Sequence, residues 1–130
     1  MHRTIALVAL ATVFLLTSCE DVPSIRVDLL TNDWLHSFEE DSPHSTAATY
    51  RPSDSRPFDP SRFRMEYMFR ENGDCLWMEL MPTDAHVLRE GRWWLSSFDE
   101  SILFVDKGAR IDSFRILELG GDILRLEAAK

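Results

Sequence analysis

The sequence predicts an all-β domain, an antiparallel up-and-down meander of about eight strands that closes into a barrel after an N-terminal signal segment. Short apolar runs recur from Leu29 to Glu127, and residues that favour turns separate them. The later connections are shorter than the dozen or so residues that a parallel crossover needs, so neighbouring strands are expected to be antiparallel. An open meander leaves two unpaired edges, and closure into a barrel removes them.

The first residues have the layout of a secretory signal. A positive start at His2 and Arg3 precedes an apolar run from Ile5 to Leu16, which is shorter than the roughly 20 residues that span a bilayer. The run ends in Leu16-Thr17-Ser18-Cys19, which resembles the lipobox of bacterial lipoproteins, where a peptidase cuts before a cysteine that carries diacylglycerol. The alternative is a buried apolar helix with an incidental cysteine.

The resemblance implies a lipoprotein that acyl chains, palmitate among them, hold at the cell envelope of a bacterium, with the outer membrane favoured. Residues 1–18 would be the signal peptide, Cys19 the lipid attachment site, residues 19–28 the lipidated tether and residues 29–130 the barrel domain. The membrane is thus an expected partner through the anchor on Cys19, because several acyl chains hold a protein firmly where one binds reversibly.

The charge of the chain limits the partners it can bind, and its cysteine content limits the disulfides it can form. The chain has a net charge of −8, and loss of residues 1–18, which hold one arginine and no acidic residue, makes it −9. An acidic body is repelled by phosphates, so no nucleic acid is expected as a partner. With Cys19 lipidated, Cys75 has no disulfide partner in the chain, and we expect it to be a buried structural thiol.

The segment before the meander divides into two parts. From Leu29 to Glu39 the apolar residues suit a first strand with a kink, or a short helical turn that leads into a strand. From Asp41 to Ser61 four prolines stand among serines, threonines and aspartates. Because proline cannot donate to a sheet ladder, this stretch is predicted to be one long loop.

The clearest local prediction is a hairpin at Asn72-Gly73, because this pair supplies the two positive φ values of a type I′ turn. A two-residue loop brings apolar side chains of both strands into pairs that face the interior. These pairs are Phe69 with Leu76, Tyr67 with Met78 and Met65 with Leu80. The same register places Trp77 and Met68 on the outer face.

Five further strands are predicted after this hairpin, because turn-forming pairs such as Glu90-Gly91 and Gly120-Gly121 interrupt the apolar runs. The predicted strands are Ala85–Arg89, Arg92–Ser97, Ile102–Asp106, Asp112–Glu118 and Asp122–Glu127. Together with the Trp34 segment and the two strands of the hairpin, they make eight.

The start of the domain resembles that of lipocalins. The first strand of that family carries Gly-x-Trp, and this chain has Leu30-Thr31-Asn32-Asp33-Trp34 before a long loop and a β meander. Asn32 stands at the glycine position, and asparagine tolerates left-handed geometry better than most residues. In lipocalins an arginine near the last strand packs over the tryptophan and closes the barrel. The resemblance therefore implies a cation–π contact between Arg125 and Trp34.

The resemblance also implies a barrel that holds one small apolar ligand, with Asp41 to Ser61 folded over its mouth. Methionine beside aromatic residues suits a loosely specific apolar site. The expected lining is Phe63, Met65, Tyr67, Phe69, Leu76, Met78, Leu80, Trp93 and Leu95, of which Tyr67, Phe69, Met65, Met78 and Trp93 are the principal ligand-binding candidates.

Two alternatives to a ligand site remain open. The same side chains can fill the interior of a small barrel and leave a packed core. The protein can also be a non-enzymatic protein–protein interaction module of the cell envelope, since Trp77, Met68 and Trp94 would then form an outer apolar patch.

No enzymatic activity is predicted, because the sequence lacks a Gly-x-Ser-x-Gly elbow, a phosphate loop and a dinucleotide fingerprint. No cofactor is expected either. The spacing of His36, His44 and His86 matches no metal motif, so no metal site is predicted.

Five arginines between residues 51 and 70 form a basic stretch in an acidic chain. Arginine grips carboxylates and phosphates, so these side chains could hold an anionic group at the barrel mouth. The preferred alternative is pairing within the chain, with Asp54, Asp59 and Glu66.

Replacement of Cys19 by alanine removes the thiol that would be lipidated. We predict that Cys19→Ala leaves unprocessed precursor or releases the protein from the membrane fraction, whereas Cys75→Ala is processed and retained normally. Immunoblots of fractionated cells measure both properties. Normal processing of Cys19→Ala together with membrane retention would contradict the lipoprotein prediction.

Overall fold

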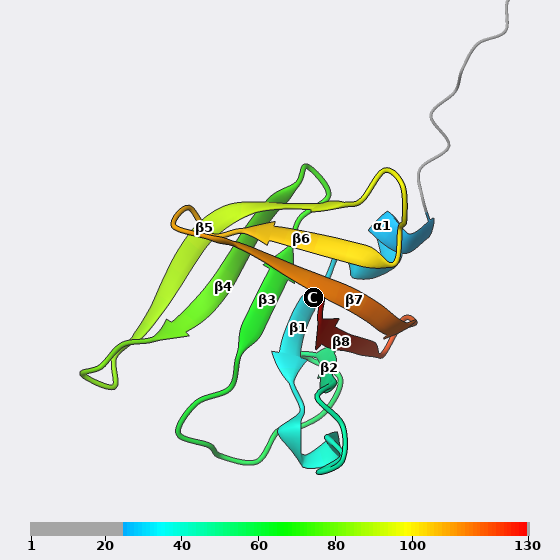
Figure 1. Cartoon of the computed structure of the whole chain (residues 1–130). Helices are drawn as coiled ribbons and strands as arrows, with labels where there is room; N and C mark the ends of the chain where they lie inside the picture. The colour runs from blue at the N-terminus through cyan, green and yellow to red at the C-terminus, as the bar shows by residue number, and fades with distance from the viewer. Residues whose placement is uncertain (1–24, 130) are drawn as a thin grey trace, which may run out of the picture.

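The computed structural model describes residues 25–129, which form a closed antiparallel barrel with one short helix, α1 (Ile25–Leu30) (Figure 1). The strands are β1 (Asp33–His36), β2 (Ala48–Pro52), β3 (Glu66–Phe69), β4 (Asp74–Leu80), β5 (His86–Leu95), β6 (Ile102–Asp106), β7 (Ile111–Leu119) and β8 (Leu124–Ala128), with a 3-10 turn, η1 (Phe38–Glu40), after β1. The predicted signal peptide and Cys19 lie outside the described residues. Within residues 25–129, no helix has the length and apolar character needed to cross a membrane.

The predicted fold class is confirmed, since the domain is all-β and its eight antiparallel strands close into a barrel. Strands β3 to β8 follow one another as a meander, and the order around the barrel is β1-β2-β8-β7-β6-β5-β4-β3. Strand β1 pairs with β3 through Trp34 and Tyr67, and β2 pairs with β8 through Tyr50 and Leu124. The first hairpin therefore stands between β3 and β8, and the connection from β2 to β3 passes β1.

The strand count is correct because two errors in the predicted boundaries compensate. The predicted long loop from Asp41 to Ser61 is wrong in its middle, where β2 forms. Pro52 is the last residue of β2, so its missing N–H interrupts the ladder only at its end. Conversely, the two strands predicted on either side of Glu90-Gly91 are a single strand, β5.

The hairpin at Asn72-Gly73 has a three-residue loop, so the predicted two-residue turn is wrong. The Arg70 amide donates to the carbonyl of Asp74 (2.8 Å), and Gly73 has a φ of +90°. This is a type I turn followed by a left-handed glycine, which makes a G1 bulge. Asn72 does not have a positive φ, and its side-chain oxygen accepts a hydrogen bond from the Asp74 amide (3.0 Å).

The extra loop residue shifts the register of β4 by one position. Phe69 lies opposite Cys75 and Tyr67 lies opposite Trp77, and all four side chains are buried. The inward position of Phe69 and Tyr67 is confirmed. Their predicted partners on β4 are wrong, because a slip of one residue exchanges the two faces of a strand. Those predicted partners, each only partly buried, are Leu76, Met78 and Leu80.

The same shift corrects the prediction of an outer aromatic patch on the hairpin. Trp77 was expected outside but is only 5% exposed, and Met68 is half-buried. Trp94 is 40% exposed and stacks on Phe104 of the neighbouring strand, with 5.5 Å between ring centres. The patch predicted for partner binding therefore loses one of its two tryptophans.

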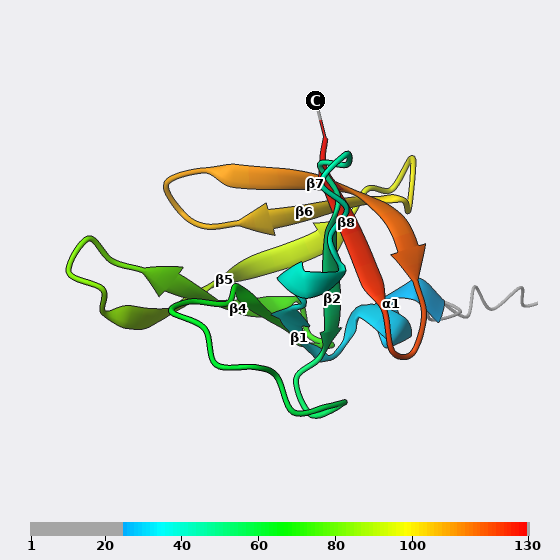
Figure 2. The same cartoon turned by 90° about the horizontal axis from the view of Figure 1, so that it is seen from below.

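Helix α1 plugs one end of the barrel. Leu30 is fully buried, and its carbonyl accepts a hydrogen bond from Nε1 of the buried Trp34 (3.0 Å). Figure 2 shows α1 at one end, and the β4–β5 and β6–β7 hairpins projecting at the other. We call these the closed end and the open end. Between them the interior is filled by apolar side chains, among them Trp34, Phe69, Leu103, Val105, Leu124 and Leu126.

The predicted stack of Arg125 on Trp34 is wrong. Strand β2 separates β8 from β1, and Arg125 lies opposite Thr49. The neighbours of Arg125 on both sides, Leu124 and Leu126, are buried, so the alternation of side chains along a strand turns Arg125 to the outer face. Trp34 is inside the barrel, where it contacts α1 instead.

Gly91 provides a test of this packing, because a Cβ there would stand 2.0 Å from the carbonyl oxygen of Asp106 and 2.7 Å from the ring of Trp77. We predict that Gly91→Ala lowers the free energy of unfolding by about 3 kcal/mol, at the upper end of overpacking effects. Gly121→Ala is the matched control, since a Cβ there meets nothing within 4 Å. Denaturant unfolding measures both, and equal stability of the two variants would contradict the packing.

Candidate functional site

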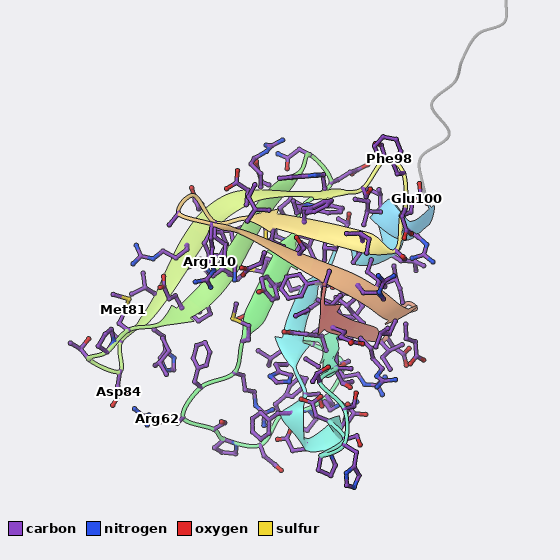
Figure 3. The ribbon with its side chains drawn as sticks, in the orientation of Figure 1. Arg62, Met81, Asp84, Phe98, Glu100 and Arg110 are labelled. Carbon is purple, nitrogen blue, oxygen red and sulfur yellow. The ribbon has the colours of Figure 1, made fainter. Side chains whose placement is uncertain are left out.

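A cleft of about 410 Å³ opens to solvent at the open end of the barrel. Its volume falls within the range of about 300 to 1,000 Å³ that is typical of small-molecule sites. The cleft is bounded by the end of the β2–β3 connection, the second half of β4 and the β6–β7 turn. In Figure 3, Arg110 and Met81 mark this side of the molecule, and Phe98 and Glu100 lie on the side of α1.

One wall of the cleft is apolar. Phe63, Met65, Trp77, Met78 and Leu80 border the cleft there. Met65 and Met78 are two of the predicted ligand-binding residues, and the structure brings them together here. Methionine is flexible and polarizable, so this wall can adapt to apolar groups of different shape.

Lys107 places a nearly buried cation against the apolar wall. Its side chain is 9% exposed, and its Nζ lies 2.8 Å from Oδ2 of Asp112 and 3.0 Å from the hydroxyl of Tyr67. The same Nζ lies 5.5 Å from the centre of the Trp77 ring. These partners compensate for the loss of water around the ammonium. Burial, together with the charge of Asp112, raises the pKa of Tyr67, so its hydroxyl stays protonated.

Two arginines add charge at the rim of the cleft. Arg110 is 70% exposed and donates from Nε to Asp112 (2.9 Å), and Arg89 donates from Nε to Glu79 (2.8 Å). Burial is the largest single effect on the pKa of Asp112 and raises it, but the hydrogen bonds and charges of Lys107 and Arg110 together outweigh it, so this pKa is lowered and the group stays ionised. Three cations thus face two carboxylates, which makes the cleft locally positive in an acidic chain.

This arrangement can hold two kinds of chemical group at once. The apolar wall of methionine, phenylalanine and leucine can bury a hydrocarbon or aromatic body. The terminal nitrogens of Arg110 take part in no hydrogen bond within the described residues, so they can donate to an anion. A planar guanidinium matches the geometry of carboxylate, sulfonate and phosphate groups.

The other predicted ligand-binding residues lie in the packed core and not in the cleft. Tyr67, Phe69 and Trp93 are each at most 5% exposed. The Tyr67 and Phe69 rings stack with centres 5.6 Å apart, and Trp93 donates its indole N–H to the carbonyl of Arg70 (2.8 Å). Tyr67 reaches the cleft only through its hydroxyl on Lys107. For these three residues the packed-core alternative describes the structure.

Cys75 is a buried free thiol, as predicted. Burial raises its pKa to about 12, although the charge of Lys107 acts in the opposite direction. Because the thiolate is the reactive form of cysteine, this side chain is inert at neutral pH.

The β2–β3 connection forms one side of the cleft. Phe63 packs edge-on against His86 of β5, with 5.5 Å between ring centres, and Arg62 pairs with Asp84 in the β4–β5 turn. These contacts join the connection to the tip of the neighbouring hairpin. The residues that border the cleft lie just beyond Ser61, the end of the segment predicted to cover the barrel mouth.

Two arginine–glutamate pairs, which we call the arginine clamp, hold η1 to the β2–β3 connection and to β2. Arg64 pairs with Glu39 and also donates to the carbonyl of Asp59 (2.9 Å). Arg51 donates to both carboxylate oxygens of Glu40 (2.9 and 2.8 Å). Hydrogen bonds from these arginines lower the pKa of both glutamates to about 2. The clamp therefore stays charged throughout the physiological pH range.

The basic stretch pairs within the chain, but its carboxylate partners differ from the predicted Asp54, Asp59 and Glu66. The pairs are Arg51 and Arg56 with Glu40, Arg62 with Asp84, Arg64 with Glu39 and Arg70 with Asp33. These arginines therefore fix loops, and the cations that border the cleft come from other parts of the chain.

Lys107, Arg110 and Arg89 are cleft residues that the sequence analysis did not identify. Strands of a meander alternate in direction, so every second turn lies at the same end of the barrel. This parity places the 82–84 and 107–110 turns together at the open end. The basic residues of the second turn are the signal that the sequence offers for this site.

Within the described part of the chain, no group of three or more His, Cys, Asp or Glu side chains could hold a metal ion. His36 contacts Asp41 instead, with 2.6 Å between Nε2 and Oδ2, and stacks on Tyr50. His86 packs against Phe63.

Comparisons with known proteins give no relative. A scan against models of protein families, a search of curated proteins and a search of solved structures each return no match. The function must therefore be inferred from the geometry of the cleft.

The arginine clamp can be tested by removing one member. We predict that Arg64→Met speeds hydrogen exchange in residues 57–63, because the connection loses its pair with Glu39 and its bond to Asp59. Strand amides should keep their protection. Arg70→Met is the control, since Arg70 forms an exposed pair with Asp33 away from the connection.

The same clamp should depend on pH in a defined direction. The folded pKa of Glu39 is about 2 and its ordinary value is 4.5, so its contribution is complete above pH 4.5 and is lost as the pH falls toward 2. Protection of residues 57–63, corrected for intrinsic exchange, should follow this course in the wild type and not in Arg64→Met. Identical pH profiles for the two proteins would contradict this role.

Proposed function

We propose that this protein is a lipid-anchored envelope lipoprotein whose lipocalin-like barrel binds a small ligand in the cleft at its open end. The ligand has an apolar body and an anionic group. The anchor is inferred from Leu16-Thr17-Ser18-Cys19, and the binding function from the cleft.

The observation that carries the proposal is the meeting of an adaptable apolar wall with a cluster of cations in one cleft of suitable volume. Met65, Met78 and Phe63 supply the wall, and Lys107 and Arg110 supply the charge. An apolar wall alone can bind many apolar ligands, whereas convergent polar groups fix the orientation of a ligand and select among ligands. The cations therefore favour an amphipathic anion over an uncharged apolar ligand.

The acidic character of the chain does not oppose this choice at close range. Charges farther away than about 8 to 10 Å are largely screened at physiological ionic strength, so the groups that border the cleft decide which charge is accepted there. The packed interior leaves the open end as the place for a ligand, which would remain partly exposed to solvent.

Two dyes of similar shape provide the test, 1-anilinonaphthalene-8-sulfonate and its uncharged relative N-phenyl-1-naphthylamine. Both fluoresce more strongly in apolar surroundings. We predict saturable binding of both dyes, with higher affinity for the sulfonate. Met78→Gln should weaken both about fivefold, because it removes part of the apolar wall. Arg110→Gln should weaken only the sulfonate, by roughly threefold, since an exposed ion pair contributes little.

Leu117→Gln is the matched control, because Leu117 is 44% exposed on β7 and does not line the cleft. It should leave both affinities unchanged. Absence of saturable binding by either dye would overturn the binding proposal. Equal affinity for the two dyes, unaffected by Arg110→Gln, would overturn the anionic part and leave an apolar site.

A further inference from the structure

Phe98 is the most exposed large apolar side chain in the described structure, at 99%. It lies in the loop between β5 and β6, at the closed end of the barrel. Trp94, 40% exposed near the end of β5, and Leu117, 44% exposed in β7, lie on the same half of the barrel. Single exposed apolar residues are ordinary in soluble proteins. An aromatic ring that is wholly exposed to water, however, contributes no burial of apolar surface to the stability of the fold.

The loop that carries Phe98 is ordered by its own hydrogen bonds. Ser96 Oγ accepts from the amide of Phe98 (3.2 Å), and Asp99 Oδ1 accepts from both the amide and the hydroxyl of Ser101 (3.0 and 2.6 Å). The amide of Ile102 donates to the carbonyl of Asp99 (3.0 Å). The backbone thus holds the ring outward in a defined position.

The same loop lies beside the point where the described chain begins. Arg26 of α1 donates from Nη1 to the carbonyl of Glu100 (3.4 Å), and Figure 3 shows Phe98 and Glu100 next to α1. Six residue steps separate Ile25 from Cys19. A fully extended chain advances at most about 3.6 Å per residue, so Cys19 lies within roughly 22 Å of Ile25.

We propose that Phe98 inserts into the bilayer interface next to the lipid anchor, so that the closed end docks on the membrane and the cleft at the open end faces away from it. This inference rests on the anchor in the proposed function and adds the orientation of the barrel. Aromatic rings are favoured at the level of the lipid headgroups, where a short anchor would hold this loop.

The charges around Phe98 indicate whether its insertion needs anionic lipid in the bilayer. Asp99 and Glu100 flank the ring on one side, and Arg26 and Arg115 lie close enough to lower the pKa of Asp99, after the larger effect of its hydrogen bonds with Ser101. Arg26 and Arg115 balance Asp99 and Glu100, and Asp28 of α1 and Glu71, which borders the same pocket as Glu100, add negative charge at this end. The docking face therefore has no excess of positive charge. Insertion should therefore need no anionic lipid and should persist in high salt.

An environment-sensitive fluorophore at position 98 tests the docking in the lipidated full chain. Phe98→Cys is labelled with a nitrobenzoxadiazole maleimide and reconstituted into phosphatidylcholine vesicles. Thr83→Cys, an exposed position in the β4–β5 turn at the open end that does not line the cleft, is labelled as the matched control. Cys19 is blocked by lipid and Cys75 is buried. The parent chain, treated with the same maleimide, reports any background labelling of these two cysteines.

We expect a blue shift of emission and several-fold quenching by shallow spin-labelled lipid at position 98, and neither at position 83. Unchanged solvent-like emission at position 98 in a chain shown by mass to be lipidated would overturn the docking and leave the anchor intact. A blue shift at 98 that occurs in native envelopes but not in pure lipid vesicles would overturn it in favour of a protein partner. A chain that carries no lipid would overturn the anchor and the docking together.

Discussion

The left-handed Gly73 sets the register of the β3–β4 hairpin, and much of the interior depends on it. Its φ of +90° completes a three-residue turn, which turns Trp77 inward. Once the indole is inside, β5 must approach it closely, and Gly91 is the residue that leaves room for its ring. The same ring lies beside the ammonium of Lys107. A two-residue turn would have exchanged the faces of β4 and removed the indole from beside that cation, leaving only the ring of Tyr67 next to it.

Closure gives the two ends of the barrel different properties. At the closed end α1 buries Leu30 against Trp34, whose indole N–H donates to the carbonyl of Leu30. At the open end the β4–β5 and β6–β7 hairpins extend beyond the packed layers, so their side chains border a cleft instead of interdigitating. The charged groups of the cleft remain compatible with folding because Asp112 pairs with both Lys107 and Arg110. A binding site at this end therefore requires no void in the core.

The fold class could be predicted because alternating apolar runs and short turns leave few topologies. Strand boundaries were predicted wrongly where the same residue type can serve two structural roles. Gly91 was taken for a turn, yet it serves close packing inside a strand. Pro52 was taken to exclude a strand, yet it ends one. Met65 and Met78 were identified for the cleft because apolar pattern suffices for them, whereas Lys107 requires knowledge of which turns meet at one end.

Methyl NMR of the methionines, during titration with 1-anilinonaphthalene-8-sulfonate, tests the location of the binding site most directly. Met65 and Met78 line the cleft, and Met68 in the same hairpin does not. The account predicts saturating shifts of the Met65 and Met78 signals with Met68 nearly unchanged. Saturating shifts confined to Met68, or signals that do not respond at any dye concentration, would contradict a ligand site at the open end of the barrel.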